Sequence, residues 1–97
     1  MVALADAPRH GYGIIQEVRR LSGGRVHLRA GTLYALLDRL EEERAIKLHH
    51  EEVVDGRLRR YYELTSSGTA LLTQESRQRA ATSKEAFRRL RLAGGMA

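Results

Sequence analysis

The chain has 97 residues, with 17 Lys and Arg against 12 Asp and Glu, which gives a formal net charge of +5. The absence of cysteine from the sequence excludes disulfides, thiolate metal sites and a cysteine nucleophile. No apolar run approaches the length of a membrane span or of a signal-peptide core, so we expect one small cytoplasmic domain.

The basic residues are mostly of one type, since fifteen of the seventeen are arginine. The planar guanidinium group binds phosphate with two parallel hydrogen bonds, which favours a nucleic-acid partner. A solvated surface from an arginine-rich proteome has the same composition. Composition leaves both interpretations open, and the positions of the arginines have to decide between them.

The first 24 residues predict a short segment and then a helix. The apolar stretch MVALAD is compatible with a very short helix, and Pro8 interrupts it. From Gly11 onward, four apolar residues fall on one helical face: Ile14, Ile15, Val18 and Leu21. Ser22-Gly23-Gly24 is typical of a helix end.

A second amphipathic helix is predicted from about Gly31 to about Arg44. Its buried face consists of leucines spaced i, i+3, i+4 and i+7, namely Leu33, Leu36, Leu37 and Leu40. The large aromatic residue Tyr34 lies off this stripe, beside Thr32, Ala35 and Arg39. The helix therefore presents a second face that needs an explanation.

A β-hairpin follows, and its register can be argued from the side chains. A two-residue turn at Asp55-Gly56 would place Leu48 opposite Glu63, so we predict a three-residue turn, Val54-Asp55-Gly56. The predicted inner pairs are Ile46 with Leu64, Leu48 with Tyr62 and His50 with Arg60; the outer pairs are Lys47 with Glu63 and Glu51 with Arg59. The neighbouring His49 and His50 should then point to opposite faces and share no metal ion.

The last predicted helix runs from about Ser66 to Leu92, with Thr65 as its N-cap and Gly94-Gly95 at its end. Its apolar face is sparse: Leu71, Leu72, Ala80, Phe87 and Leu90. A helix this long and this weakly apolar is typical of one that lies against another chain. We expect residues 1–65 to form a winged helix-turn-helix, with 66–97 as a dimerisation helix of the same compact unit.

The order of elements is helix, helix, helix, two-stranded hairpin and long helix. This order predicts a mainly α fold with a small β-hairpin, the winged helix-turn-helix, in which the helix before the wing enters the major groove of DNA.

Three segments carry a resemblance to a known family. HGYGI at 10–14, GTLYALLDRLEEERAI at 31–46 and GRLRRYYELTSSG at 56–68 resemble the signature of the PadR family of transcriptional regulators. The resemblance implies a homodimeric repressor on a palindromic operator. It places the dimer contact in the last helix with help from the first, so that Leu4 joins the residues above.

Two departures from the family pattern stand out. The family's first helix normally starts further upstream, which bears on how much of the dimer contact this chain retains. In place of Gly-Leu-Ile the chain has Arg44-Ala45-Ile46, so Arg44 has to make the helix-to-strand turn without glycine. We expect some backbone strain there.

The candidate DNA-binding residues are His10, Tyr12, Arg29, Thr32, Tyr34, Ala35, Arg39, Arg57 and Arg59. Free N–H groups at helix starts favour phosphate, Arg39 can read guanine, and the wing arginines can reach the minor groove. Several of these residues also have an alternative, structural interpretation. Tyr34 and Tyr12 can be packing aromatics, Thr32 an ordinary first-turn residue, Arg39 a partner of Glu43, and Arg59 a partner of Glu51.

We therefore predict a DNA-binding transcriptional regulator, with double-stranded DNA as partner and no enzyme activity or cofactor. The resemblance implies release by a small aromatic or cationic effector at the dimer interface, although the chain has no tryptophan to stack on one. The alternatives are a winged-helix protein-interaction module and a ligand sensor without strong DNA binding.

Overall fold

The computed structural model describes residues 1–94. Residues 95–97, including Gly95 and the end of the predicted 66–97 segment, lie outside the described residues. The elements in chain order are a 3-10 helix η1 (Val2–Leu4), β1 (Arg9–His10), α1 (Gly11–Leu21), α2 (Ala30–Glu42), β2 (Ile46–Val54), β3 (Arg57–Leu64) and α3 (Ser66–Leu92).

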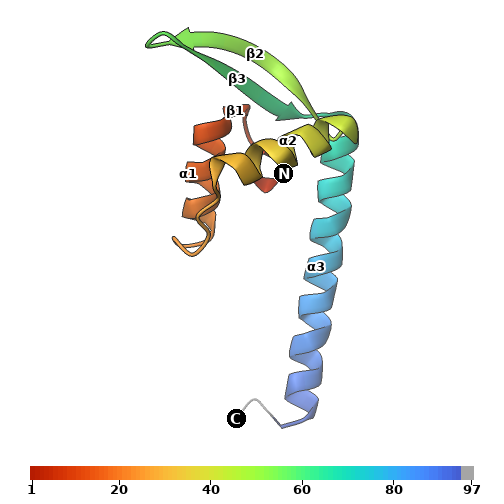
Figure 1. The fold of residues 1–97 in the computed structure, drawn as a ribbon. Helices are drawn as coiled ribbons and strands as arrows, with labels where there is room; N and C mark the ends of the chain where they lie inside the picture. The colour runs from red at the N-terminus through yellow and green to blue at the C-terminus, as the bar shows by residue number, and fades with distance from the viewer. Residues whose placement is uncertain (95–97) are drawn as a thin grey trace.

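The molecule consists of a small head and a projecting helix (Figure 1). In the head, α1 and α2 pack beneath an antiparallel sheet with strand order β1-β3-β2. The core is formed by Ala3, Leu4, Ile14, Leu33, Leu37, Ile46 and Tyr62. This is the predicted winged helix-turn-helix, with α2 directly before the wing and α3 extending away from the head.

The N-terminal segment differs from the three-helix expectation. The predicted first helix is a single 3-10 turn, and the guanidinium Nε of Arg9 holds it by donating to the carbonyl of Ala3 at 2.8 Å. The strand β1 that follows was not predicted. It pairs with β3 through Arg9 opposite Tyr62 and His10 opposite Tyr61. A strand of two residues has no periodicity from which it could be recognised.

The hairpin register was correct at the base of the wing and wrong at its tip. Asp55 and Gly56 both have positive φ, 52° and 74°, as a two-residue type I′ turn requires. Between Leu48 and His50 a β-bulge absorbs one residue, so Ile46 still pairs with Leu64 and Leu48 with Tyr62. The predicted three-residue turn is therefore wrong. That prediction assumed that the two strands pair in one uniform register, without a bulge.

The bulge changes the partners predicted for the outer half of the wing. His50 lies opposite Tyr61 rather than Arg60, and Glu51 lies opposite Arg60 rather than Arg59. Glu51 and Arg60 form an ion pair at 3.4 Å. The predicted pair of Lys47 with Glu63 is confirmed, at 3.6 Å.

The two neighbouring histidines also differ from expectation. The bulge at His49 breaks the strand alternation, so the ring centroids of His49 and His50 lie 4.9 Å apart instead of on opposite faces. Within residues 1–94, no group of three or more His, Cys, Asp or Glu side chains is arranged to hold a metal ion.

A tightly bonded corner joins α2, the wing and α3. The predicted N-cap is confirmed, because the Thr65 hydroxyl accepts a hydrogen bond from the N–H of Gly68 at 3.0 Å. The same hydroxyl donates to the carbonyl of Arg44 at 2.6 Å, and the Thr65 N–H donates to the carbonyl of Ala45 at 3.0 Å. These bonds hold the first turn of α3 against the end of α2 and the base of the wing. None of the helices in the described residues is long and apolar enough to cross a membrane.

Arg44 closes α2 in a backbone conformation that glycine usually supplies. Its φ is 59°, and the N–H of Ala45 donates to the carbonyl of Leu40 at 2.9 Å, as in a Schellman motif. α1 ends in the same motif with Gly23, whose φ is 65°, in the equivalent place. The strain expected at Arg44 is therefore present in the backbone.

We expect Arg44→Gly to raise the free energy of unfolding by about 0.5–1 kcal/mol, because relief of the left-handed strain exceeds the entropic cost of glycine. Urea denaturation monitored by circular dichroism measures the change. Gly23→Arg is the matched opposite and should lower stability by a similar amount. A less stable Arg44→Gly protein would show that the arginine side chain contributes more than the strain removes.

Candidate nucleic-acid interface

The helix α2 buries one face and exposes the other. Leu33 and Leu37 are 1% and 3% exposed, respectively, whereas Tyr34, about 100° further round the helix than Leu33, is 56% exposed. Leu36 departs from the predicted buried stripe, since it is 41% exposed and turned toward α3. The exposed face of α2 is free to contact a partner such as the DNA major groove.

The amino ends of α1 and α2 both suit an anion. Neither helix has an acidic residue in its first turn, so no carboxylate neutralises the helix dipole there. In α1 one N–H group, that of Gly13, is already bonded to the His10 ring. Tyr12 stands exposed at the start of α1. Arg29, the N-cap of α2, makes no side-chain cap hydrogen bond and is exposed to solvent.

A concave surface lies between these helices and β3. Ten residues line it: His10, Gly11, Tyr12, Tyr34, Asp38, Arg57, Leu58, Arg59, Arg60 and Tyr62. Five of the nine predicted DNA-binding residues, from the four elements β1, α1, α2 and β3, are therefore brought together. The four others lie along α2, where Arg29, Thr32, Ala35 and Arg39 are all exposed.

The position of Tyr34 depends on a glycine in α1. A Cβ atom built on Gly11 would lie 3.2 Å from the Tyr34 hydroxyl, which is a tight contact. The Tyr34 hydroxyl thus packs directly over the start of α1, which leaves its ring exposed between the two helices. This contact places the phenol of Tyr34 at the amino end of α1.

Two arginines in this region have acidic partners. Arg39 pairs with Glu43 at 3.1 Å, which is one of the two interpretations left open by the sequence. Arg60 pairs with Glu51 and lines the concave surface, but sequence reasoning did not select it because the predicted register placed it beside His50. Arg57 and Arg59 have no salt-bridge partner within the described residues.

Burial and neighbouring charges shift two pKa values at this surface. Burial, and then the nearby Arg59 guanidinium, lower the pKa of His10, so its ring is uncharged at neutral pH. Burial, and then the carboxylate of Glu41, raise the pKa of Tyr62, so its hydroxyl stays protonated. The positive charge of the surface therefore comes from its arginines.

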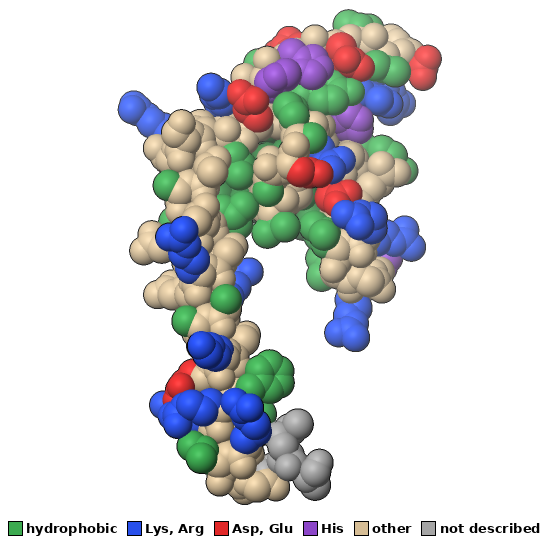
Figure 2. Space-filling view, turned by 180° about the vertical axis from the view of Figure 1, so that it is seen from behind, with side chains coloured by type: hydrophobic (Ala, Val, Ile, Leu, Met, Phe, Trp, Pro, Cys, Tyr) green, Lys and Arg blue, Asp and Glu red, His purple; other side chains and the backbone are tan. Residues whose placement is uncertain are grey.

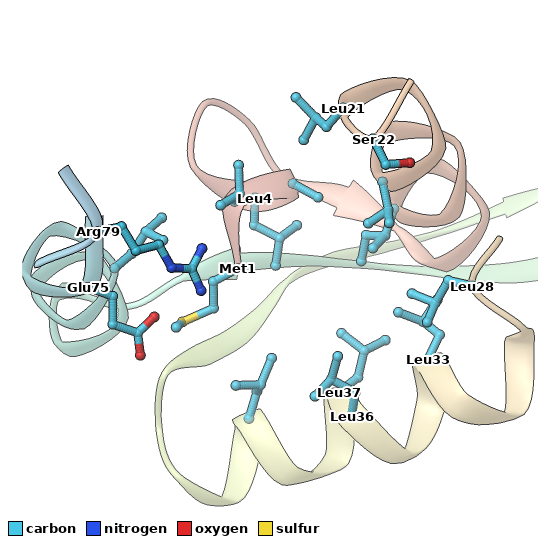
Figure 3. A pocket seen from close by; sticks show the side chains of 16 residues that line it. Met1, Leu4, Leu21, Ser22, Leu28, Leu33, Leu36, Leu37, Glu75 and Arg79 are labelled. Atoms are coloured by element: carbon cyan, nitrogen blue, oxygen red, sulfur yellow. The ribbon is translucent and has the colours of Figure 1, made fainter. Parts of the chain in front are cut away.

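An apolar groove opens on the other side of α2, between the head and α3 (Figures 2 and 3). Its volume is about 450 Å³, and its walls include Leu21 from α1, Leu36 from α2 and Leu72 from α3. Glu75 and Arg79 of α3 add charged groups to this lining.

The residues predicted for a dimer contact fall into two groups. Leu4 is buried in the core of its own chain, at 5% exposure, and also lines the groove. The others lie along α3: Leu72 is half-buried beside the groove, and Leu71, Ala80, Phe87 and Leu90 are exposed. Phe87 is 62% exposed and Leu90 50%, so α3 presents apolar side chains to solvent near its end.

The chain is similar to known proteins of one family. The family model described as "Transcriptional regulator PadR-like family" matches residues 1–74. The transcriptional regulator Rv3488 of Mycobacterium tuberculosis is 44% identical over 73 residues, which are 75% of this chain and 64% of that protein. An uncharacterised protein X of Lysinibacillus sphaericus is 35% identical over 71 residues, 73% of this chain and 65% of that protein. The chain thus spans less than two thirds of the length of these relatives, 65% and 64%.

Solved structures agree with the fold. A PadR family transcription regulator from Clostridium difficile superimposes with a TM-score of 0.75 at 28% identity, covering 92% of this chain and 91% of that one. A PadR-like transcription factor from Bacteroides fragilis gives a TM-score of 0.74, also at 28% identity, covering 90% and 82%.

Proposed function

This chain belongs to the PadR-like family of transcriptional regulators, and from that membership we propose that it represses transcription by binding a palindromic operator as a homodimer. One observation carries the proposal: the concave surface between α1, α2 and the wing gathers Tyr12, Tyr34, Arg57 and Arg59 beside the amino end of α1. Regulators of this fold use these elements to hold phosphates and to read base edges.

The proposed contacts have different roles along the surface. Arg57 and Arg59 bind phosphate or the minor groove beneath the wing, while Tyr12, Tyr34, Arg29 and Thr32 hold the backbone at the helix starts. Ala35 and Arg39 face the bases, with Arg39 leaving Glu43 to reach guanine. Asp38 and the acidic end of α2 keep the second half of the helix away from phosphate.

The proposed dimer uses the exposed apolar residues of α3. Leu71, Leu72, Ala80, Phe87 and Leu90 would pack against the same helix of a second subunit, and burial of Phe87 alone would contribute about 1.5–3 kcal/mol. Two recognition helices are then placed one DNA turn apart, about 34–36 Å.

The groove between the head and α3 supports the proposal of an effector. Its volume lies in the range of small-molecule sites, and its lining is mainly aliphatic. Glu75 and Arg79 place opposite charges in the lining, and the lining has no aromatic side chain on which a ring could stack. We propose a small, mainly apolar compound as the effector class.

Fluorescence anisotropy with DNA from upstream of the chain's own gene tests the proposal. A scrambled duplex of the same length is the control, and both are titrated over a series of salt concentrations. We expect the upstream DNA to bind at least ~10³-fold tighter than the scrambled duplex, with affinity falling steeply as salt rises. Equal and weak binding to both duplexes would contradict operator recognition by this segment.

A further inference from the structure

His10 lies where the wing meets the start of α1. It is the last residue of β1 and also the N-cap of α1, where its ring Nδ1 accepts a hydrogen bond from the N–H of Gly13 at 3.0 Å. An imidazole nitrogen accepts only while it carries no proton. This cap therefore exists in the uncharged form of the ring and is lost in the charged form.

The rest of the ring contacts the wing. Tyr61 of β3 meets His10 edge to face, with ring centroids 5.0 Å apart, and Tyr61 in turn stacks on His50 of β2 at 4.2 Å. The Nη1 atom of Arg59 lies 3.4 Å from His10 Nε2. His10 thus connects the helix start to β3, and Tyr61 extends this contact to β2.

The charges around His10 come from each element packed against it. Arg59 of β3 and the N–H groups at the start of α1 disfavour a proton on the ring, while Glu52 of β2, which accepts from the Tyr61 hydroxyl at 3.1 Å, favours one. The Nε2 atom of His50 lies 3.6 Å from the carboxylate Oε2 of the same Glu52. From α2, Tyr34 and Asp38 line the same concave surface.

We propose that uncharged His10 is a clasp that fixes the wing against α1, and that protonation of its ring opens this clasp. The clasp sets the spacing between Arg59 and Tyr12, so its role in binding rests on the proposed function. His10 is in this respect a positioning residue, which acts on DNA through its neighbours. The pKa of His10 is depressed in the folded protein, so the clasp is complete above the ordinary histidine pKa and is lost as pH falls through the folded-state value.

The clasp is tested first without DNA, by NMR titration from about pH 8 to about pH 5, which brackets histidine ionisation. We expect the Gly13 amide resonance to shift with the same midpoint as the His10 ring. In His10→Asn the amide oxygen keeps the cap but does not titrate, so the Gly13 step should disappear. Arg59→Gln should raise the His10 midpoint. A Gly13 resonance that stays still, or that moves equally in His10→Asn, would overturn the clasp.

Binding to a random-sequence 20-base-pair duplex at low salt tests the consequence, and it needs no knowledge of the operator. Between about pH 7.5 and about pH 5.5, the affinity of the wild-type protein should fall about fivefold more than that of His10→Asn. This factor corresponds to the usual free-energy cost of losing one helix cap. Tighter binding of the wild type in acid would overturn the positioning role and make protonated His10 a phosphate ligand. No binding by either protein would overturn the proposed function, while the NMR titration still decides the clasp itself.

Discussion

Replacing Gly68 by alanine is expected to lower the free energy of unfolding by about 3 kcal/mol or more, at or beyond the upper end of the usual cost of overpacking. A Cβ atom on Gly68 would lie 1.9 Å from the carbonyl oxygen of Ala45, which is backbone and cannot rotate away. That oxygen already accepts the N–H of Thr65. The first turn of α3 would have to move away from the base of the wing.

Thermal unfolding followed by circular dichroism measures this effect, and the expected fall in Tm is about 12–24 °C for a domain of this size. Gly31→Ala is the matched control, because Gly31 lies in α2 with no atom within 4 Å of the added Cβ. Its Tm should stay unchanged or rise, as helix propensity predicts. A Gly68→Ala protein that melts together with the wild type would show that the corner tolerates displacement.

The double substitution of Arg57 and Arg59 by glutamine is expected to weaken DNA binding about 50-fold at 0.1 M salt, and to reduce the slope of log K against log salt by about 2. Both arginines line the concave surface and lack salt-bridge partners in the described part of the chain. Each one bound to a phosphate releases about one counterion. Anisotropy on the random-sequence duplex at several salt concentrations measures both quantities.

The control for this prediction lies at the far end of α3. Arg88 and Arg89 both pair with Glu85, at 2.7 and 2.9 Å, and lie beyond the described groove and concave surface. Their replacement by glutamine removes the same formal charge as the wing variant. Because these residues lie away from the proposed interface, the salt slope should stay unchanged. If the two double variants lost affinity equally, net charge rather than the wing would account for binding.

Much of the architecture could be predicted from local signals. The leucine spacing located α2, and Leu33 and Leu37 are buried as expected. The Thr65 cap and the apolar pattern placed α3 at its observed bounds. These features depend on residues within a few positions of one another, so a sequence displays them directly.

The features that escaped prediction depend on distant partners or on local irregularity. The bulge at His49 was missed because a uniform register satisfied the side-chain pairs at both faces. β1 exists only because β3 is present to pair with it. Leu36 belongs to the leucine stripe, yet it faces a groove whose other wall is α3. Arg60 lines the concave surface but was not selected as a candidate, because the uniform register placed it on the inner face beside His50.

The bonded corner at Thr65 has a mechanical consequence. At about 1.5 Å per residue, the 27 residues of α3 form a lever about 40 Å long, pivoted where Thr65 holds the carbonyls of Arg44 and Ala45. A rotation of about 5° at this pivot displaces the far end by about 3.5 Å. The groove beside Leu72 and Glu75 adjoins the pivot. A ligand bound there would change the separation of two proposed subunits without contacting any of the proposed DNA-binding residues.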